Sequence, residues 1–409
     1  MWFWPKALDA LPPQDRVQRY FFVQRTCFAA IGIDPTSIRS TIFNRFLAWI
    51  PMFCMLIIIG PMGLYALKYI QTDLDQMASA LAPMWQAILS IVKFFLFMWN
   101  RKKIVRLVRE VWMWSLEVNE KELVLLADEI RYDVYLSMLY ASSCCCSAVL
   151  ATLSPFIVAL VYGWKGYGFW DSLEEPFKGV YFVNDKKTIW SYTFWYIWTL
   201  FAIHYVVNGT VAIDSLFSWF MRNISAQFQI LNLRFQLASD NHNLKEGDNN
   251  QPHEDLNKSI IECIKYHQRI IELAEKFNDV YKHLVFVKFL VSCIQLACLT
   301  FQFQQGNSIV TQMFNFSFFI TATIQLMIYC HGGQRIKDMS LSVSTSLWEH
   351  FNWHNLHPKS QKLLLLPLQR SQMPCNLIGI FFVADFNLFV WVFRTAASFM
   401  TMMLTVDKK

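Results

Sequence analysis

Residues 79–99 read SALAPMWQAILSIVKFFLFMW, and residues 100–109, which follow directly, read NRKKIVRLVR. The first stretch is almost entirely apolar and is long enough to cross a bilayer, which takes roughly 20 such residues. The second stretch places a cluster of Lys and Arg directly after it. Because Lys and Arg gather on the cytoplasmic side of membrane helices, this pair of stretches predicts a transmembrane helix that ends in the cytosol.

The same alternation of apolar runs and basic segments continues along the chain. Of the 409 residues, 55% are hydrophobic and only 16% are charged, whereas soluble domains carry about 25% charged residues. These numbers exclude an ordinary soluble protein and predict an all-α membrane protein, with a single seven-helix domain over residues 1–404. We expect its spans near 46–68, 79–99, 134–162, 190–221, 280–302, 308–330 and 377–404.

The basic residues also predict the orientation of the chain. Most of the 36 Lys and Arg residues lie in segments 1–45, 100–133, 222–279 and 331–376. Placing these segments in the cytosol puts the N-terminus inside the cell and, after seven crossings, the C-terminus outside. A conventional metabotropic seven-helix receptor has the opposite orientation, so this pattern disfavours coupling to a G protein.

The predicted cytosolic segments are more than short connections. Residues 104–112 and 260–277 carry apolar side chains at helical spacing, which is typical of helices that pack on one another. We therefore expect 222–279 and 331–376 to form cytosolic anchor helices. The polar stretch 239–258 has few apolar residues, and we expect a flexible cytosolic loop there.

The last eighty residues carry the most informative motifs. Residues 329–334 read YCHGGQ at the end of the sixth span, and residues 370–374 read RSQMP. Trp348 and Trp353 lie between them, and residues 398–404 close the last span with SFMTMML. In these features the chain resembles the insect odorant receptor family, with Trp348 and Phe399 standing where the family usually has Tyr, and with the family's early glycine shifted to Gly379.

The resemblance implies a function as well as a fold. Members of this family are subunits of tetrameric, odour-gated, non-selective cation channels, in which a ligand-tuning subunit assembles with a shared co-receptor. The co-receptor has a long insertion between spans four and five. Segment 222–279 is short by comparison, so the chain resembles a tuning subunit in the plasma membrane of an olfactory neuron dendrite. The implied partners are a volatile odorant, permeant cations and lipid, with no nucleic acid, cofactor or metal.

The resemblance also implies a pore along the last span. The family's gate positions fall on Met402 and Val406, which lie four residues apart and so face one way on a helix. Ser398 and Thr395 lie deeper on the same face and would suit a wetted lining. The alternative is that all four side chains pack against lipid or neighbouring helices.

Arg394 stands out within the last span, because an Arg in a membrane helix is costly and usually faces water or a partner. We expect it near the cytosolic vestibule, paired with Asp385 or with another subunit. The alternative is an Arg that snorkels to the membrane interface.

The family's ligand pocket lies in the outer half of spans two, three, four and six. Ser147, Ala151 and Ser154 form a stripe of small residues on span three, which could leave room for a ligand or let helices pack closely. Walls of this kind suit a mostly apolar volatile molecule with one hydroxyl or carbonyl. The other candidate lining residues are Ile88 and Val92 on span two, Trp195, Thr199 and Ile203 on span four, and Phe318 on span six.

The sequence is less consistent with three other functions. His350, His354 and His357 have a spacing that could bind a metal, but the chain lacks the usual zinc-enzyme motif and the repeats typical of transporters. A gustatory-type receptor channel would close with a motif that this chain lacks. A metabotropic receptor would require the opposite orientation.

Overall fold

The computed structural model describes residues 21–36, 49–181, 188–245, 252–303 and 308–407. Within these ranges, seven helices are long and apolar enough to cross a membrane. This confirms the predicted all-α fold with seven spans, whereas the orientation of the termini stays a prediction. The seven helices are α4 (Ile50–Tyr69), α5 (Leu74–Leu116), α6 (Glu120–Trp164), α8 (Ile189–Lys245), α9 (Pro252–Gln302), α10 (Ile309–His350) and α12 (Phe386–Asp407).

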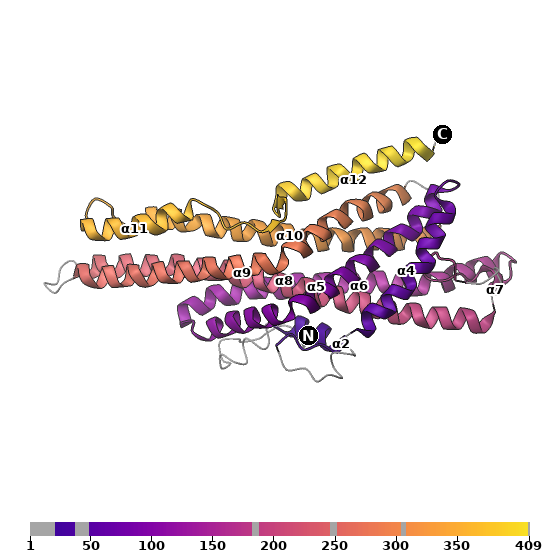
Figure 1. Ribbon diagram of the computed structural model, residues 1–409, viewed down its shortest axis with the longest axis horizontal. Helices are drawn as coiled ribbons and strands as arrows, with labels where there is room; N and C mark the ends of the chain where they lie inside the picture. Colours follow the sequence, from indigo (N-terminus) through magenta and orange to yellow (C-terminus); the bar gives the residue numbers. More distant parts are fainter. Residues whose placement is uncertain (1–20, 37–48, 182–187, 246–251, 304–307, 408–409) are drawn as a thin grey trace.

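Several of these helices are much longer than a membrane is thick. Helix α8 has 57 residues, which gives about 86 Å at 1.5 Å per residue, against roughly 30 Å for the hydrocarbon core. The molecule is accordingly elongated, and the far ends of α8, α9 and α10 form a rod beside the short helix α11 (Pro358–Ser371) (Figure 1). The remaining short helices are α2 (Phe22–Ala30) and α7 (Phe169–Ser172).

The rod explains why the observed helices run past the expected spans. Phe228, Phe235 and Ile260 are fully buried in the rod, so apolar packing continues the helices without a break. The expected flexible loop at 239–258 is therefore wrong at both ends, because α8 continues to Lys245 and α9 begins at Pro252. Residues 246–251 of that loop, and residues 46–48 of the first expected span, lie outside the described residues.

The last span begins later than expected. Residues 377–385 were assigned to the membrane helix, but strands β1 (Ile378–Gly379) and β2 (Phe382–Val383) form an antiparallel hairpin there. Its turn places Ile380 at a φ of 56°, in the left-handed region that a β-branched residue rarely adopts. The hairpin lies so close to α10 that a Cβ on Gly333 would stand 1.9 Å from the carbonyl oxygen of Ala384. Helix α12 therefore starts only at Phe386.

A buried carboxylate joins four of the long helices. Asp214 on α8 is 0% exposed, and both of its oxygens accept from Lys93 Nζ on α5, at 2.6 and 2.8 Å. The hydroxyls of Tyr140 on α6 and Tyr329 on α10 donate to it at 3.1 and 2.6 Å, and Gln325 Nε2 on α10 donates at 2.7 Å. A buried charge is tolerated only when it is paired and hydrogen-bonded in this way, so this cluster fixes the relative positions of α5, α6, α8 and α10.

We expect Asp214→Asn to destabilise the fold severely, because it leaves the Lys93 ammonium buried without its counter-charge. Breaking a buried pair in this way costs about 3–5 kcal/mol, which thermal unfolding of the full-length chain in detergent would detect. Adding Lys93→Met to the same variant should recover part of the loss, since no unpaired charge then remains.

The matched control is Asp279→Asn, which removes a carboxylate paired with Lys103 at 3.5 Å on the surface, where the side chains are 60% and 54% exposed. Surface changes of this type stay within about 0.5 kcal/mol. Equal losses in the two single variants would contradict the central role given to Asp214.

Candidate functional site

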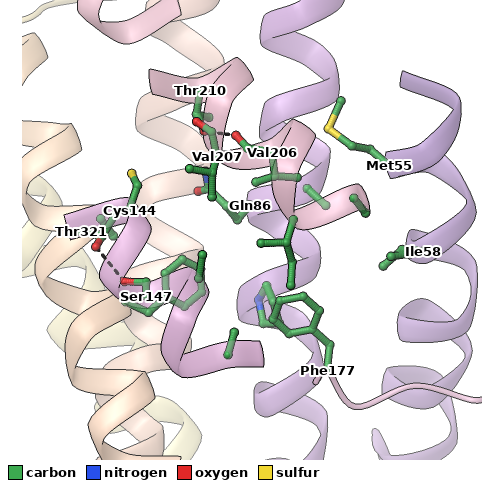
Figure 2. Close-up of a pocket in the computed structure, with 18 of the residues that line it drawn as sticks. Met55, Ile58, Gln86, Cys144, Ser147, Phe177, Val206, Val207, Thr210 and Thr321 are labelled. Carbon is green, nitrogen blue, oxygen red and sulfur yellow. Dashed lines mark hydrogen bonds between the residues drawn. The ribbon is translucent and has the colours of Figure 1, made fainter. Parts of the chain in front are cut away.

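An apolar cavity of about 100 Å³ lies among five of the membrane helices and one connecting loop. Its walls are side chains of α4, α5, α6, α8 and α10, together with Phe177 from the chain between α7 and α8 (Figure 2). The lining is formed by Met55, Ile58, Met62, Pro83, Gln86, Ala87, Cys144, Ser147, Ala148, Ala151, Phe177, Ala202, Ile203, Val206, Val207, Thr210, Phe314, Phe318, Thr321, Ala322 and Gln325.

Hydroxyl groups form one polar spot in this apolar wall. Ser147 Oγ on α6 lies 3.0 Å from Thr321 Oγ1 on α10 (Figure 2) and 2.8 Å from Ser317 Oγ. The three hydroxyls can exchange donor and acceptor roles, since a hydroxyl rotates to suit its partner. Ser147 Oγ and Thr321 Oγ1 also donate to the carbonyls of Ser143 and Ser317, at 3.0 and 2.9 Å, so the spot offers acceptor lone pairs to a donor on a bound molecule.

The cavity also touches the buried charge cluster. Gln325 lines the cavity, while its Nε2 donates to Asp214 and its Oε1 accepts from Lys288 Nζ on α9. Cys144, another lining residue, lies one turn along α6 from Tyr140, which also donates to Asp214. A molecule in the cavity would thus meet the side chains that hold the helices in register.

The loop that carries Phe177 is fixed against the bundle. The backbone N–H of Val180 donates to the Pro61 carbonyl of α4 at 3.0 Å, and the Tyr192 hydroxyl donates to the Glu174 carbonyl at 3.2 Å. Phe177 itself lies 6.4 Å, centroid to centroid, from Phe314 of α10. The described part of this loop, residues 173–181, therefore completes the cavity wall.

Four of the nine predicted lining residues meet in this cavity: Ser147, Ala151, Ile203 and Phe318. They come from spans three, four and six, and each is one part of the set that was predicted. That any of them binds a ligand stays a prediction.

The other five predicted residues do not line the cavity. On α5 the lining side chains are Pro83, Gln86 and Ala87, whereas Ile88 and Val92 point away by about 100° or more at 100° per residue. The sequence did carry a signal for this face that was missed, because Gln86, Ser90 and Lys93 form a polar stripe at i, i+4 and i+7 and Gln86 lines the cavity.

Ser154, Trp195 and Thr199 lie beyond the ends of the cavity wall. The Ser154 hydroxyl donates back to the Ala151 carbonyl at 3.2 Å. Trp195 packs against Tyr181 of the loop with ring centroids 5.3 Å apart, so it supports the loop from outside. Thr199 is fully buried, one turn before Ile203 on α8.

Sequence reasoning missed the contributions of α4 and of the loop. Met55 and Ile58 of α4 line the cavity (Figure 2). Met62 of the same helix also lines it, one turn beyond Ile58. The three side chains are 1%, 3% and 1% exposed. The structure thus distinguishes this buried face from the other sides of a helix that is apolar all round. No pattern in the sequence indicated the position of Phe177, because a loop has no periodicity.

Helix α12 presents two different faces. Leu388, Val392 and Ala396 are buried against the bundle, while Met402 is 56% exposed and Ser398 is also exposed. Thr395 is half-buried, and its hydroxyl donates to the Trp391 carbonyl at 2.9 Å. Of the predicted pore residues, Met402 and Ser398 therefore lie on the face turned away from the chain's own bundle and Thr395 lies at its edge, while the Val406 side chain lies outside the described residues.

Arg394 is exposed on α12 and does not pair with Asp385 as expected. The Asp385 carboxylate instead accepts from the backbone N–H of Leu388 at 3.1 Å and pairs with Lys337 of α10 at 3.3 Å. It thus serves as a cap for the start of α12 and ties that helix to α10.

The other C-terminal motif residues have structural roles. Arg370 Nη1 donates to the Met373 carbonyl at 2.9 Å, which closes the turn after α11. Trp353 Nε1 donates to the Leu347 carbonyl at 3.3 Å, where α10 ends. Among the described residues, no group of three or more His, Cys, Asp or Glu side chains is arranged to hold a metal, so the histidine series at 350–357 does not form such a group.

Comparison with known proteins identifies the family of this chain. The sequence model of the 7tm Odorant receptor family matches residues 73–397. Odorant receptor 45a of Drosophila melanogaster is 26% identical over 393 residues, which cover 95% of this chain and 99% of that protein. Odorant receptor 9a of the same species is 28% identical and covers 95% of this chain and 96% of its own length.

Solved structures give the same fold. The insect olfactory receptor OR5 from Machilis hrabei in complex with eugenol superposes with a TM-score of 0.75 at 13% identity, covering 98% of this chain and all of that one. A second structure of OR5 from Machilis hrabei gives a TM-score of 0.72 at 14% identity. A family match over most of the length, full-length relatives and the seven-helix fold together show that this chain belongs to the odorant receptor family, whose insect members are ligand-gated channels.

Proposed function

We propose that this odorant receptor is the ligand-tuning subunit of a heteromeric, odour-gated cation channel that it forms with the odorant-receptor co-receptor. The observation that carries this proposal is an apolar cavity among the membrane helices, in the same chain as a helix, α12, whose outward face is unpartnered within the described residues. The full-length relatives with receptor names, odorant receptors 45a and 9a, support the tuning role.

The cavity favours a small, mostly apolar ligand with one hydroxyl or carbonyl group. Its lining is aliphatic and aromatic apart from Gln86, Gln325, Thr210, Cys144 and the Ser147–Thr321 pair. A few placed polar groups in an apolar wall typically orient a ligand while burial supplies the affinity. The related structure from Machilis hrabei holds eugenol, a molecule of this class, which supports the same class of ligand here.

The exposed face of α12 supports a pore at a subunit contact. Met402 is apolar and exposed, and Ser398, which is also exposed, lies one helical turn before it on the same side. Rings of apolar side chains from several subunits can close a channel by excluding water. The proposed orientation places this end of α12 on the extracellular side and the rod of α8–α11 in the cytosol, in the plasma membrane of an olfactory neuron dendrite.

The direct test of the proposal is whole-cell recording from cells that express this chain with and without the co-receptor. With G-protein signalling blocked, a panel of volatile alcohols, esters and phenols should evoke a fast cation current only when both subunits are present. A response that requires G proteins, or an unchanged current without the co-receptor, would refute the tuning-subunit assignment.

Filling the cavity should reduce sensitivity to the ligand. We expect Ala151→Phe to raise the half-maximal odorant concentration at least tenfold, because the added ring occupies the space that the ligand needs. The measurement is the dose–response curve of the current for the best ligand of the panel.

Val149→Phe is the matched control, since Val149 lies on the same helix but is 53% exposed. It should leave the curve unchanged at equal surface expression. A shift of similar size in both variants would mean that the cavity is not the binding site.

A polar side chain at the gate should favour the open state. We expect Met402→Ser to raise the basal current in the absence of odorant several-fold, since a hydroxyl lowers the cost of wetting a narrow pore. Val390→Ser is the control, because Val390 has nearly the same exposure, 57% against 56% for Met402, on another side of α12. If only the control variant leaks, Met402 does not line the gate.

A further inference from the structure

A second hollow lies between α2 and the part of α5 beyond its membrane run. It has a volume of about 680 Å³, and its walls include Phe21, Trp112 and Met113 beside Arg25 and Arg109. We propose that this groove binds the headgroup of an anionic phospholipid. The inference goes beyond odour detection and rests on the proposed function only for the cytosolic placement of the groove.

Basic side chains of α5 and α2 cluster at this groove. At 100° per residue, Arg101, Lys102, Arg106 and Arg109 fall within an arc of about 140° on α5, and Arg25 of α2 adds to this side from across the groove. Lys102, Arg106, Arg109 and Arg25 are all exposed. Such a basic cluster directly cytoplasmic of a membrane helix is typical of sites that attract anionic lipids.

Acidic side chains nearby do not neutralise this cluster. Among the described residues that line the groove, Asp34 is the one acid, and its carboxylate accepts from the backbone N–H and the hydroxyl of Thr36 at 2.8 and 2.7 Å. Glu110, the next residue after Arg109, pairs with Lys276 of α9 at 3.7 Å. The groove therefore keeps an excess of positive charge.

The arginine side chains are placed for phosphate. Arg109 Nε donates to the Thr36 carbonyl at 3.3 Å, and Arg101 Nη2 donates to the Asp34 carbonyl at 3.4 Å. These bonds hold each guanidinium against the segment after α2. A guanidinium has five N–H donors, so Arg109 can still bind a phosphate oxygen, for which its planar shape is well suited.

The apolar wall distinguishes a lipid from a free anion. Phe21 lies with its ring centroid 6.0 Å from that of Trp112, and Met113 beside them is 56% exposed. A soluble phosphate would gain nothing from this wall, whereas the glycerol backbone of a lipid would contact the apolar surface of Trp112 and Met113. On α5 the groove begins at Val108, nine residues or about 14 Å past the apolar run that ends at residue 99, so a headgroup rather than an acyl chain can enter it.

The test uses the full-length chain in detergent micelles and the fluorescence anisotropy of labelled short-chain phosphatidylserine, with labelled phosphatidylcholine beside it. We expect phosphatidylserine to bind more tightly, and Arg25→Gln with Arg109→Gln to weaken its binding about thirtyfold. The control, Lys258→Gln with Lys265→Gln, removes two exposed cations of α9 and should leave binding unchanged. If the first variant does not fold, Lys102→Gln with Arg106→Gln replaces it, with a similar loss expected.

Three results would overturn the proposal. One is equal binding of the two lipids, and another is an equal loss in the control. The third is displacement of the labelled lipid by free phosphoserine at the concentration at which unlabelled lipid competes, which would identify a site for a soluble phosphate. None of these readouts involves odorants or current, so they are separate from failure of the channel assignment.

Discussion

The pairing of Asp214 with Lys93 in the middle of the bundle constrains the rest of the structure. A carboxylate with no exposed surface must find all its partners within the protein, and here they come from α5, α6 and α10. Each partner side chain has a fixed length and approaches Asp214 from one direction, so the four helices can pack in only a few relative positions. Apolar contacts alone would permit sliding between helices, because lipid and side chains are equally apolar.

This constraint also links the ligand cavity to the rest of the fold. Gln325 faces the cavity and holds Asp214, and Tyr329, one turn further along α10, holds the same carboxylate while stacking on Phe217 at 4.2 Å between centroids. Gly333, one more turn along, receives the hairpin that starts α12. A molecule that shifts Gln325 would therefore act on the same face of α10 that positions α12, although coupling itself requires two arrangements of these contacts with different ligand affinities.

The sequence predicted the parts of this architecture that depend on composition and period. Seven apolar runs gave seven helices, and the small-residue stripe brought Ser147 and Ala151 to the cavity. The lining face of α5 was missed, although Gln86, Ser90 and Lys93 mark one side of the run 79–99 with polar groups at helical spacing. Phe177 and the hairpin at 378–383 were hidden, since tertiary packing rather than local pattern determines where a loop lies and where a helix starts.

The two faces of α12 differ for a related reason, because polar and charged side chains need a partner or water. Its inner face packs through Val392 and Ala396, and its first turn is tied to α10 by Asp385 and Lys337. The outer face combines large apolar side chains, such as Trp391 at 54% exposed, with Ser398 and Arg394. Lipid suits the first kind of side chain but not an Arg, which in a membrane helix usually faces water or a protein partner. Such a mixture is what a helix requires when part of its outer surface meets neighbouring subunits and part meets a wetted pore.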